Sequence, residues 1–237
     1  MTQPPSQPPP NAGYSLRFLI ITALFVTTLI TSNVAAVKLV VLFGLTVSGG
    51  ELVFPVSYIF GDVLTEVYGY SRARLVIWTG FACNLFFVFF VWAAGRLPAA
   101  DFWHNQAAYD IILGVAPRML CASLLAFLCG EFTNSYIMAK LKIRTSGRHL
   151  WLRTISSTVA GQALDTVIFV TIAFFGVIPG RALLVTLLHQ WFFKCMFEAL
   201  LTPLTYKAVG FLKNREGVDV YDRHTVFNPF YMFTPDK

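Results

Sequence analysis

The sequence has few charged residues. Only 13% of its 237 residues are Asp, Glu, Lys or Arg, whereas 56% are hydrophobic. A soluble globular domain usually carries about 25% charged residues, so this composition indicates a membrane protein. The net charge of +6 comes from basic residues that are scattered between apolar runs. Because nucleic-acid binding needs a concentrated basic patch or stripe, we expect no nucleic-acid partner.

Cysteine is also scarce. The four cysteines, Cys83, Cys121, Cys129 and Cys195, lie inside apolar runs, and none belongs to a Cys-x-x-Cys pair. Neither a disulfide framework nor a zinc site is indicated. We expect these cysteines to be small buried hydrophobic residues, and we predict no metal and no other cofactor.

The motifs of the common enzyme classes are missing. The sequence contains no HExxH, GxSxG or Walker pattern. A membrane aspartyl protease would need a Gly-x-Gly-Asp element, but Ile59 and Phe60 precede the Gly61–Asp62 pair. An enzyme is therefore not expected.

Long apolar segments are what the sequence has instead. Six of them approach the roughly 20 residues that a helix needs to cross a bilayer, and they cover residues 16–37, 54–70, 75–94, 114–139, 152–177 and 182–208. Between the first two, KLVVLFGLTVSGGELVF carries β-branched residues on both sides of a Ser-Gly-Gly turn signal. This stretch predicts a short hairpin or re-entrant loop. We expect an all-α integral membrane protein with six transmembrane helices in residues 16–212.

The loop charges predict the orientation, because short cytoplasmic loops carry an excess of Lys and Arg. The basic residues that follow the second, fourth and sixth segments are Arg72, Arg74, Lys140, Lys142, Arg144, Arg148, Arg153, Lys207, Lys213 and Arg215. Six spans place all of them on one side, so both termini are expected in the cytoplasm. Residues 1–15 are rich in proline and predict a disordered tail, and residues 213–237 predict a second cytoplasmic tail.

Polar side chains inside the predicted spans are the main functional signal, because such groups are costly in a membrane. They are Asn33, Asp62, Glu66, Glu131, Asn134, Gln162, Asp165, Lys194 and Glu198. All except Asn33 form pairs three or four residues apart, so both members of a pair share one helical face. Either the pairs converge on one interior, or they only join helices, with Lys194 bonded to Glu198.

An interior with five acids and one lysine favours a cation, a proton or a neutral ligand with many N–H donors. An ionised carboxylate can accept from two adjacent N–H groups, such as N1–H and the 2-amino group of a guanine-like base. Asn33, Asn134 or Gln162 would meet the other edge atoms of that base. The aromatic residues considered for stacking on it are Phe54, Tyr58, Tyr68, Phe169 and Trp191.

Four segments closely resemble the queuosine precursor transporter family of bacterial inner membranes, also described as vitamin uptake transporters. They are FPVSYIFGDVLTEVYGYSRAR, GEFTNSYIMAKLKI, GQALDTVIFVTIAFFG and KNREGVDVYDRHTVFNPF. The resemblance maps the family motifs onto Phe54, Pro55, Asp62, Glu66, Tyr68, Gly69, Arg74, Glu131, Asn134, Gln162 and Asp165. The serine that often precedes the Gln-x-x-Asp element is Gly161 here, which is expected to affect helix packing rather than binding.

The resemblance implies a fold and a substrate. The fold is similar to the substrate-binding subunits of energy-coupling-factor transporters. The substrates are 7-cyano-7-deazaguanine and 7-aminomethyl-7-deazaguanine, and both keep the N1–H and 2-amino fork. One of Asp62 and Glu66 would bind the base, and the other would be protonated or bonded to Arg74. Asp62, Glu66 and Glu198 are the candidates for proton coupling.

An alternative is a substrate-binding membrane subunit for another small vitamin-like molecule, which would need an energising partner. Similar subunits dock such a partner through small residues on the first helix, and Ser32 with Ala36 gives a small-xxx-small face there. The sequence leaves open whether this partner exists, whether the chain forms a homo-oligomer, and which deazaguanine it prefers. Membrane lipid is the other expected partner.

Overall fold

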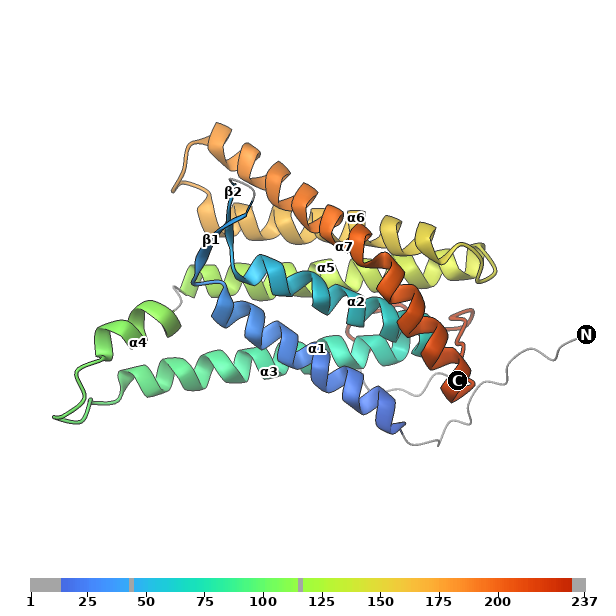
Figure 1. Cartoon of the computed structure of the whole chain (residues 1–237), viewed down its shortest axis with the longest axis horizontal. Helices are drawn as coiled ribbons and strands as arrows, with labels where there is room; N and C mark the ends of the chain where they lie inside the picture. Colours follow the sequence, from blue (N-terminus) through green and yellow to red (C-terminus); the bar gives the residue numbers. More distant parts are fainter. Residues whose placement is uncertain (1–13, 43–44, 115–116, 232–237) are drawn as a thin grey trace, which may run out of the picture.

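Six long helices make up most of the molecule. The computed structural model describes residues 14–42, 45–114 and 117–231. Its elements are α1 (Leu16–Ala35), β1 (Leu39–Leu42), β2 (Leu45–Ser48), α2 (Gly50–Tyr68), α3 (Tyr70–Arg96), α4 (Gln106–Leu113), α5 (Pro117–Arg144), α6 (Leu150–Phe174) and α7 (Gly180–Glu216). The long helices run lengthwise beside one another, whereas α4 projects at one end (Figure 1). The all-helical expectation is confirmed.

Helix α2 is the central helix. It packs against α1, α3, α5 and α7, and 13 of its 19 residues are buried. Its aliphatic residues join a core that continues through Phe25 and Leu29 of α1 and Val76 and Ile77 of α3. Neighbouring helices thus bury Asp62 and Glu66 of α2, and such interior positions are the ones that ionisable residues take in membrane proteins.

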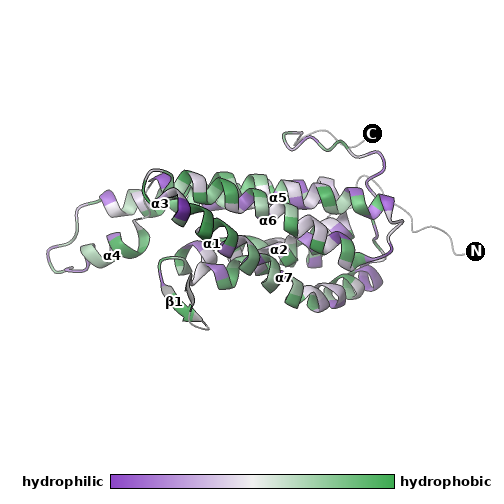
Figure 2. Ribbon diagram, turned by 90° about the horizontal axis from the view of Figure 1, so that it is seen from above, coloured by the Kyte–Doolittle hydropathy of each residue, from purple (hydrophilic) through white to green (hydrophobic). Residues whose placement is uncertain are grey.

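Five segments are long and apolar enough to span a membrane. They are α1, α3, the stretch Gln106–Arg144 that contains α5, α6, and α7. Helix α2 is not among them, because Glu51, Asp62 and Glu66 place three carboxylates in 19 residues. Hydrophobic residues extend along most of the length of the helices (Figure 2). These findings make the chain a multi-pass membrane protein.

The predicted hairpin between α1 and α2 is present. Strands β1 and β2 pair antiparallel, with Leu39 opposite Ser48 and Leu42 opposite Leu45. The hairpin, α4 and the turn between α6 and α7 lie at one end of the bundle (Figure 1). The start of α1, the α2–α3 junction, the α5–α6 turn and the end of α7 lie at the other. We call the latter the basic end, because it carries the basic residues that the sequence places after the second, fourth and sixth segments.

Several helix bounds differ from those predicted. Arg72 and Arg74, expected in a loop, lie in the first turns of α3. This is possible because Gly69 ends α2 with φ +83° and lets α3 begin at the next residue. The basic residues predicted after the fourth and sixth segments form what we call the basic cluster. Helices α5 and α7 extend to Arg144 and Glu216, so part of this basic cluster is helical. The proline-rich segment up to residue 13 lies outside the described residues.

The segment after α7 packs back onto the bundle, and we call residues 217–231 the strap. The Asp222 carboxylate accepts from the backbone N–H of Tyr70 at 3.0 Å. Arg74 donates to the carbonyls of Val226 and Asn228, and the Trp78 indole donates to the carbonyl of Pro229. The strap therefore covers the start of α3 at the basic end.

Candidate functional site

Six polar residues from four helices are buried together between α2, α5, α6 and α7. We call them the polar interior: Asp62, Glu131, Asn134, Gln162, Asp165 and Glu198. The first four are 0% exposed, Glu198 is 2% exposed and Asp165 is 3% exposed. Glu131 interacts with Asp62 and Asp165, and Glu198 interacts with Asp62 and Glu131. At least one member of each sequence pair therefore lies in this interior.

Asp62 and Asn134 join α2 to α5. The Asn134 side-chain N–H donates to Oδ1 of Asp62 at 2.7 Å. Within the described part of the chain, Oδ2 of Asp62 and Oδ1 of Asn134 have no hydrogen-bond partner. The pair therefore keeps two acceptors for another molecule, and buried acceptors of this kind are costly unless they are satisfied.

Glu131 lies against Gly61 of α2. A Cβ at residue 61 would overlap Oε1 of Glu131, so only glycine lets this carboxylate sit beside the helix. Neither Glu131 oxygen has a hydrogen-bond partner among the described residues. The hydroxyl of Tyr58, also on α2 and 0% exposed, is unpartnered as well.

Two glycines allow α5 and α6 to approach closely. A Cβ at Gly130 would come within 2.7 Å of the Tyr58 hydroxyl and 2.8 Å of the Asp165 Cβ, and one at Gly161 within 2.9 Å of the Asn134 Cβ. This contact brings the pair on α5 next to the pair on α6. Gly161 thus contributes to helix packing, because a side chain there would press against Asn134.

Glu198 brings α7 to the same place. The Thr158 hydroxyl donates to Oε1 of Glu198 at 2.5 Å, while Oε2 has no partner in the part of the chain described. The Gln162 amide lies close enough to interact with this carboxylate but makes no direct hydrogen bond of good geometry. Within residues 14–42, 45–114 and 117–231, neither its nitrogen nor its carbonyl oxygen has a hydrogen-bond partner with good geometry.

Lys194 does not pair with Glu198, which corrects the alternative expectation. Its ammonium donates to Oδ2 of Asp165 on α6 at 2.6 Å and lies 5.0 Å from the centre of the Phe54 ring on α2. The Phe54 and Tyr58 rings are 5.5 Å apart. A cation and two aromatic rings thus border the polar interior next to Asp165.

Glu66 has a different environment, although it lies one turn from Asp62. Arg153 binds its carboxylate with two N–H groups, at 2.7 and 2.8 Å, and Lys213 donates to it at 2.6 Å. The Lys142 ammonium is 3.7 Å from Oε1 and also bonds Asp219 of the strap. We call these five residues the ion cluster. The cluster joins α2, α5, α6, α7 and the strap at the basic end.

Several predicted site residues lie elsewhere. Asn33 donates to Asn84 of α3 at 2.8 Å. Tyr68 packs edge-on against Phe18. Arg74 binds carbonyls of the strap and not Glu66, which corrects that expected pairing, because Glu66 faces α5, α6 and α7 while Arg74 extends from α3 under the strap.

Two further stacking candidates make other contacts. The Trp191 indole donates to the carbonyl of Val159 at the surface, and Phe169 contacts Phe174. Of the five aromatic residues considered, Phe54 faces Lys194 and Tyr58 interacts with the acids of the polar interior.

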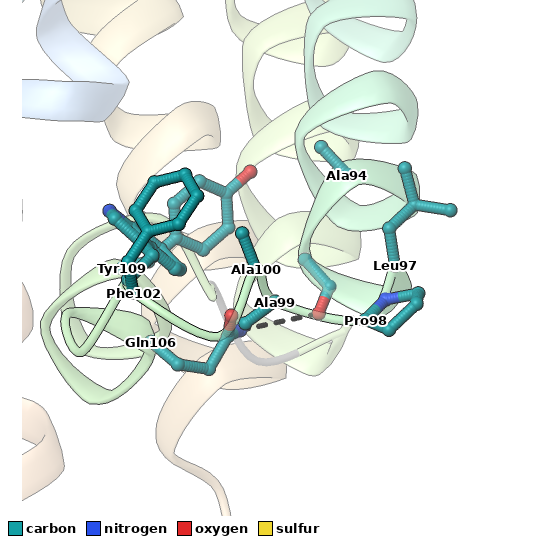
Figure 3. Close-up of a pocket in the computed structure, with 10 residues that line it drawn as sticks. Ala94, Leu97, Pro98, Ala99, Ala100, Phe102, Gln106 and Tyr109 are labelled. Atoms are coloured by element: carbon teal, nitrogen blue, oxygen red, sulfur yellow. Dashed lines mark hydrogen bonds between the residues drawn. The ribbon is translucent and has the colours of Figure 1, made fainter.

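Two cavities lie outside the polar interior. The smaller, about 270 Å³, is bordered by the end of α3, the following loop and α4, where Gln106 donates to the Gly95 carbonyl (Figure 3). The larger, about 720 Å³, is an apolar groove along α1 and α3. No predicted site residue borders either one. The residues at 14–42, 45–114 and 117–231 offer no group of three or more His, Cys, Asp and Glu for a metal ion.

Some residues of these clusters gave no functional signal in the sequence. Lys142 and Lys213 counted only as loop charges, because the segments that became α5 and α7 were predicted to end at residues 139 and 208. Arg153, the second residue of the predicted segment 152–177, was counted with them. Thr154, Thr158 and Thr166 on α6 are buried beside the acids. Their four-residue spacing would have placed them on one face with Gln162.

Comparison with known proteins gives the family. The family model described as "Putative vitamin uptake transporter" matches residues 48–208. The "Probable queuosine precursor transporter" of Bacillus subtilis (strain 168) is 32% identical over 188 residues, which cover 79% of this chain and 82% of that protein. The "Queuosine precursor transporter" of Escherichia coli (strain K12) is 26% identical over 153 residues, 64% of this chain and 66% of that protein.

No solved structure matches the chain, so its fold is described from its own residues. The family model covers more than half of the sequence, and the Bacillus subtilis protein aligns along most of both chains. The described helices include five able to span a membrane. The chain therefore belongs to the queuosine precursor transporter family, whose members are named as transporters and not as enzymes.

Proposed function

We propose that this chain imports queuosine precursors, 7-cyano-7-deazaguanine or 7-aminomethyl-7-deazaguanine, across a bacterial inner membrane. The observation that carries this proposal is the polar interior, where buried oxygen and nitrogen atoms of Asp62, Glu131, Asn134 and Gln162 lack partners among the described residues. A purine-like base supplies donors and acceptors along both edges, and it would satisfy such a set. Two curated relatives are named for the same substrate class.

The geometry suggests a role for each part of the polar interior. Asp62, oriented by Asn134, would accept from the N1–H and 2-amino fork of the base. Gln162 and Asn134 would meet its carbonyl and ring-nitrogen positions. Phe54 and Tyr58 would lie against its face. Glu131 and Glu198, which have unpartnered oxygens, would carry protons if import is proton-coupled.

We assign Glu66 to closure of the basic end instead of proton transfer. Three cations surround it, and the ion cluster lies one helical turn, about 5 Å, from Asp62 along α2. A substrate leaving the polar interior in that direction would have to pass between the helix ends that the cluster joins.

Six spans and a cytoplasmic basic end also belong to this proposal. Helix α2 would cross as an inner helix, shielded by α1, α3, α5 and α7, which is compatible with its carboxylates. The excess of Lys and Arg at the basic end would place that end, and both termini, in the cytoplasm.

The small residues on α1 do not favour an external partner. The Ser32 hydroxyl donates to the Gly50 carbonyl at 3.0 Å, and a Cβ on Gly50 would lie 2.9 Å from the Ala36 Cβ. This small-xxx-small face packs against α2 within the chain. Transport by the purified chain alone in liposomes would show directly that no energising partner is required.

The test uses cells that lack both queuosine synthesis and their own precursor transporter. We expect the native chain to restore queuosine in tRNA when either deazaguanine is supplied at low concentration. Asp62→Asn should abolish recovery at equal membrane expression, because an amide cannot accept both N–H groups of the fork. Asp165→Asn should do the same, because it removes the partner of Lys194.

Asp101→Asn is the matched control. It makes the same carboxylate-to-amide change at an exposed residue in the loop after α3, so recovery should equal that of the native chain. If the native chain inserts into the membrane and restores nothing with either precursor, the proposed substrate is wrong. If it restores queuosine and Asp62→Asn does too, the assigned binding role is wrong.

A further inference from the structure

Among the described residues, Lys194 is the lysine that bonds directly to a member of the polar interior. It lies on α7 with its side chain 7% exposed, and its ammonium is 2.6 Å from Oδ2 of Asp165 on α6. A buried ammonium needs a partner of opposite charge. Asp165 supplies it directly, and the Glu51 carboxylate of α2 also interacts with this ammonium. The site therefore has a fixed positive group at one border and unpaired acceptors in its middle.

The position of this ammonium is set from two sides. Asp165 holds it from α6, and the Phe54 ring, 5.0 Å away on α2, faces it as an aromatic ring faces a cation. The neighbouring Tyr58 ring is 5.5 Å from Phe54. A planar base lying against these rings would have an edge close to Lys194.

The ammonium also has unused hydrogen-bonding capacity. It carries three N–H donors, and in the described ranges its one hydrogen-bond acceptor is Asp165. Two donors therefore remain for a ligand. Such a group attracts a neutral acceptor and opposes a second cation.

The two proposed substrates differ only in the group attached to C7. Both present the same guanine edge, but one carries a nitrile, which is a neutral acceptor, and the other an aminomethyl group, which is a cation. We propose that Lys194 is the specificity-determining residue and that its ammonium donates to the nitrile, so the chain prefers the cyano base over the aminomethyl base. The inference rests on the proposed function and adds substrate preference to it.

The size of the effect follows from the charges. A second ammonium near Lys194 would be a like-charge contact in a partly desolvated site, and such contacts discriminate strongly between partners. We expect the native chain to favour the cyano base by at least about tenfold. The acids alone would instead favour the aminomethyl cation. The direction of the measured preference therefore shows whether Lys194 or the acids determine it.

The first experiment varies the ligand and leaves the protein native. Purified protein in liposomes takes up labelled cyano base in competition with 7-cyano-, 7-methyl- and 7-aminomethyl-7-deazaguanine. The proposal requires inhibition to weaken in that order, because the methyl group is neutral but accepts no hydrogen bond. Inhibition by the aminomethyl compound equal to or stronger than that by the methyl compound would overturn it.

The second experiment varies the residue. Lys194→Met removes the charge and keeps the stem, and it should lower the ratio of cyano to aminomethyl uptake by about tenfold. Lys194→Arg keeps the charge and should keep the direction of the preference. Lys207→Met, at an exposed residue of the same helix, is the matched control and should leave the ratio unchanged.

The outcomes separate this inference from the proposed function. If the native chain transports neither base, the proposed function fails. If it transports both and Lys194→Met reduces both equally, the proposed function stands but Lys194 has only a structural role. Should Lys194→Met fail to fold, as judged by size-exclusion chromatography in detergent, the competition series on native protein still decides.

Discussion

At the scale of single residues, Glu66 shows how a costly group is stabilised. Its side chain is 0% exposed, and Arg153, Lys142 and Lys213 surround it. A carboxylate that accepts from two N–H groups of one guanidinium forms one of the stronger ion pairs in proteins. Removal of one partner from a buried pair leaves an uncompensated charge, and the loss exceeds the net value of the pair.

We therefore expect Arg153→Met to destabilise the protein by about 3–5 kcal/mol. The measurement is thermal unfolding of purified protein in one detergent. Arg144→Met is the control, because Arg144 lies at the same end of the bundle but is exposed. Equal midpoints for the two variants would show that the ion cluster contributes little to stability.

At the scale of elements, ion pairs to the ends of α5 and α7 hold the start of the strap. Asp219, at its start, accepts from Lys142 at 2.5 Å and lies 2.8 Å from the Lys213 ammonium. Burial alone would raise the pKa of Asp219, but the hydrogen bonds from Lys142 and Lys213 outweigh it and lower the pKa below its ordinary value. A carboxyl group with a lowered pKa stabilises the folded state where it is ionised.

This shift predicts a pH dependence. The contribution of Asp219 is fully present above its unfolded pKa of about 3.9, and it is lost as pH falls through the lower folded pKa. At pH 7 we expect Asp219→Asn to lower the melting temperature by about 2–4 °C. Below about pH 4 the difference from native protein should shrink, because the native carboxyl group also becomes neutral.

Melting temperatures of both proteins across pH 3 to 8 would check this. Asp101→Asn, at an exposed residue, should show no such pH-dependent difference. A gap between native protein and Asp219→Asn that stays constant down to pH 3 would contradict the assignment of the effect to Asp219.

At the scale of the whole molecule, the bundle has two chemically distinct ends. Both ends of the described chain and the basic cluster lie at one end, while the hairpin and α4 lie at the other (Figure 1). The proposed orientation predicts which residues an impermeant reagent can reach. Val41 on β1, His104 in the loop before α4 and Ser146 in the α5–α6 turn are exposed and serve as reporters.

We expect a membrane-impermeant maleimide to label Val41→Cys and His104→Cys in intact spheroplasts, in a background without native cysteines. Ser146→Cys should react only after permeabilisation, because the basic end is expected to face the cytoplasm. Labelling of Val41→Cys and Ser146→Cys from the same side would show that α2 does not cross the membrane. A background chain that still transports precursor is the required control.

The sequence by itself determined the membrane class, the long helices, the hairpin and the family. All four follow from local information. The length of an apolar segment, the turn residues and the sequence motifs can each be read within a single segment. The family resemblance is confirmed by the matching family model and relatives. The positions of the acids within the helices were also readable, because a spacing of three or four residues fixes a shared face.

Only the tertiary structure decided which polar groups meet. Glu66 and Asp62 share a face of α2, yet one contacts three cations and the other an amide. Asp62 lies beside the middle of α5, whereas Glu66 lies beside the ends of α5 and α7 and the start of α6. Lys194 could reach Glu198 along its own helix but bonds Asp165 on α6. Partners across helices depend on helix packing and on glycines such as Gly130 that allow close approach, and this information is absent from the spacing within any one segment.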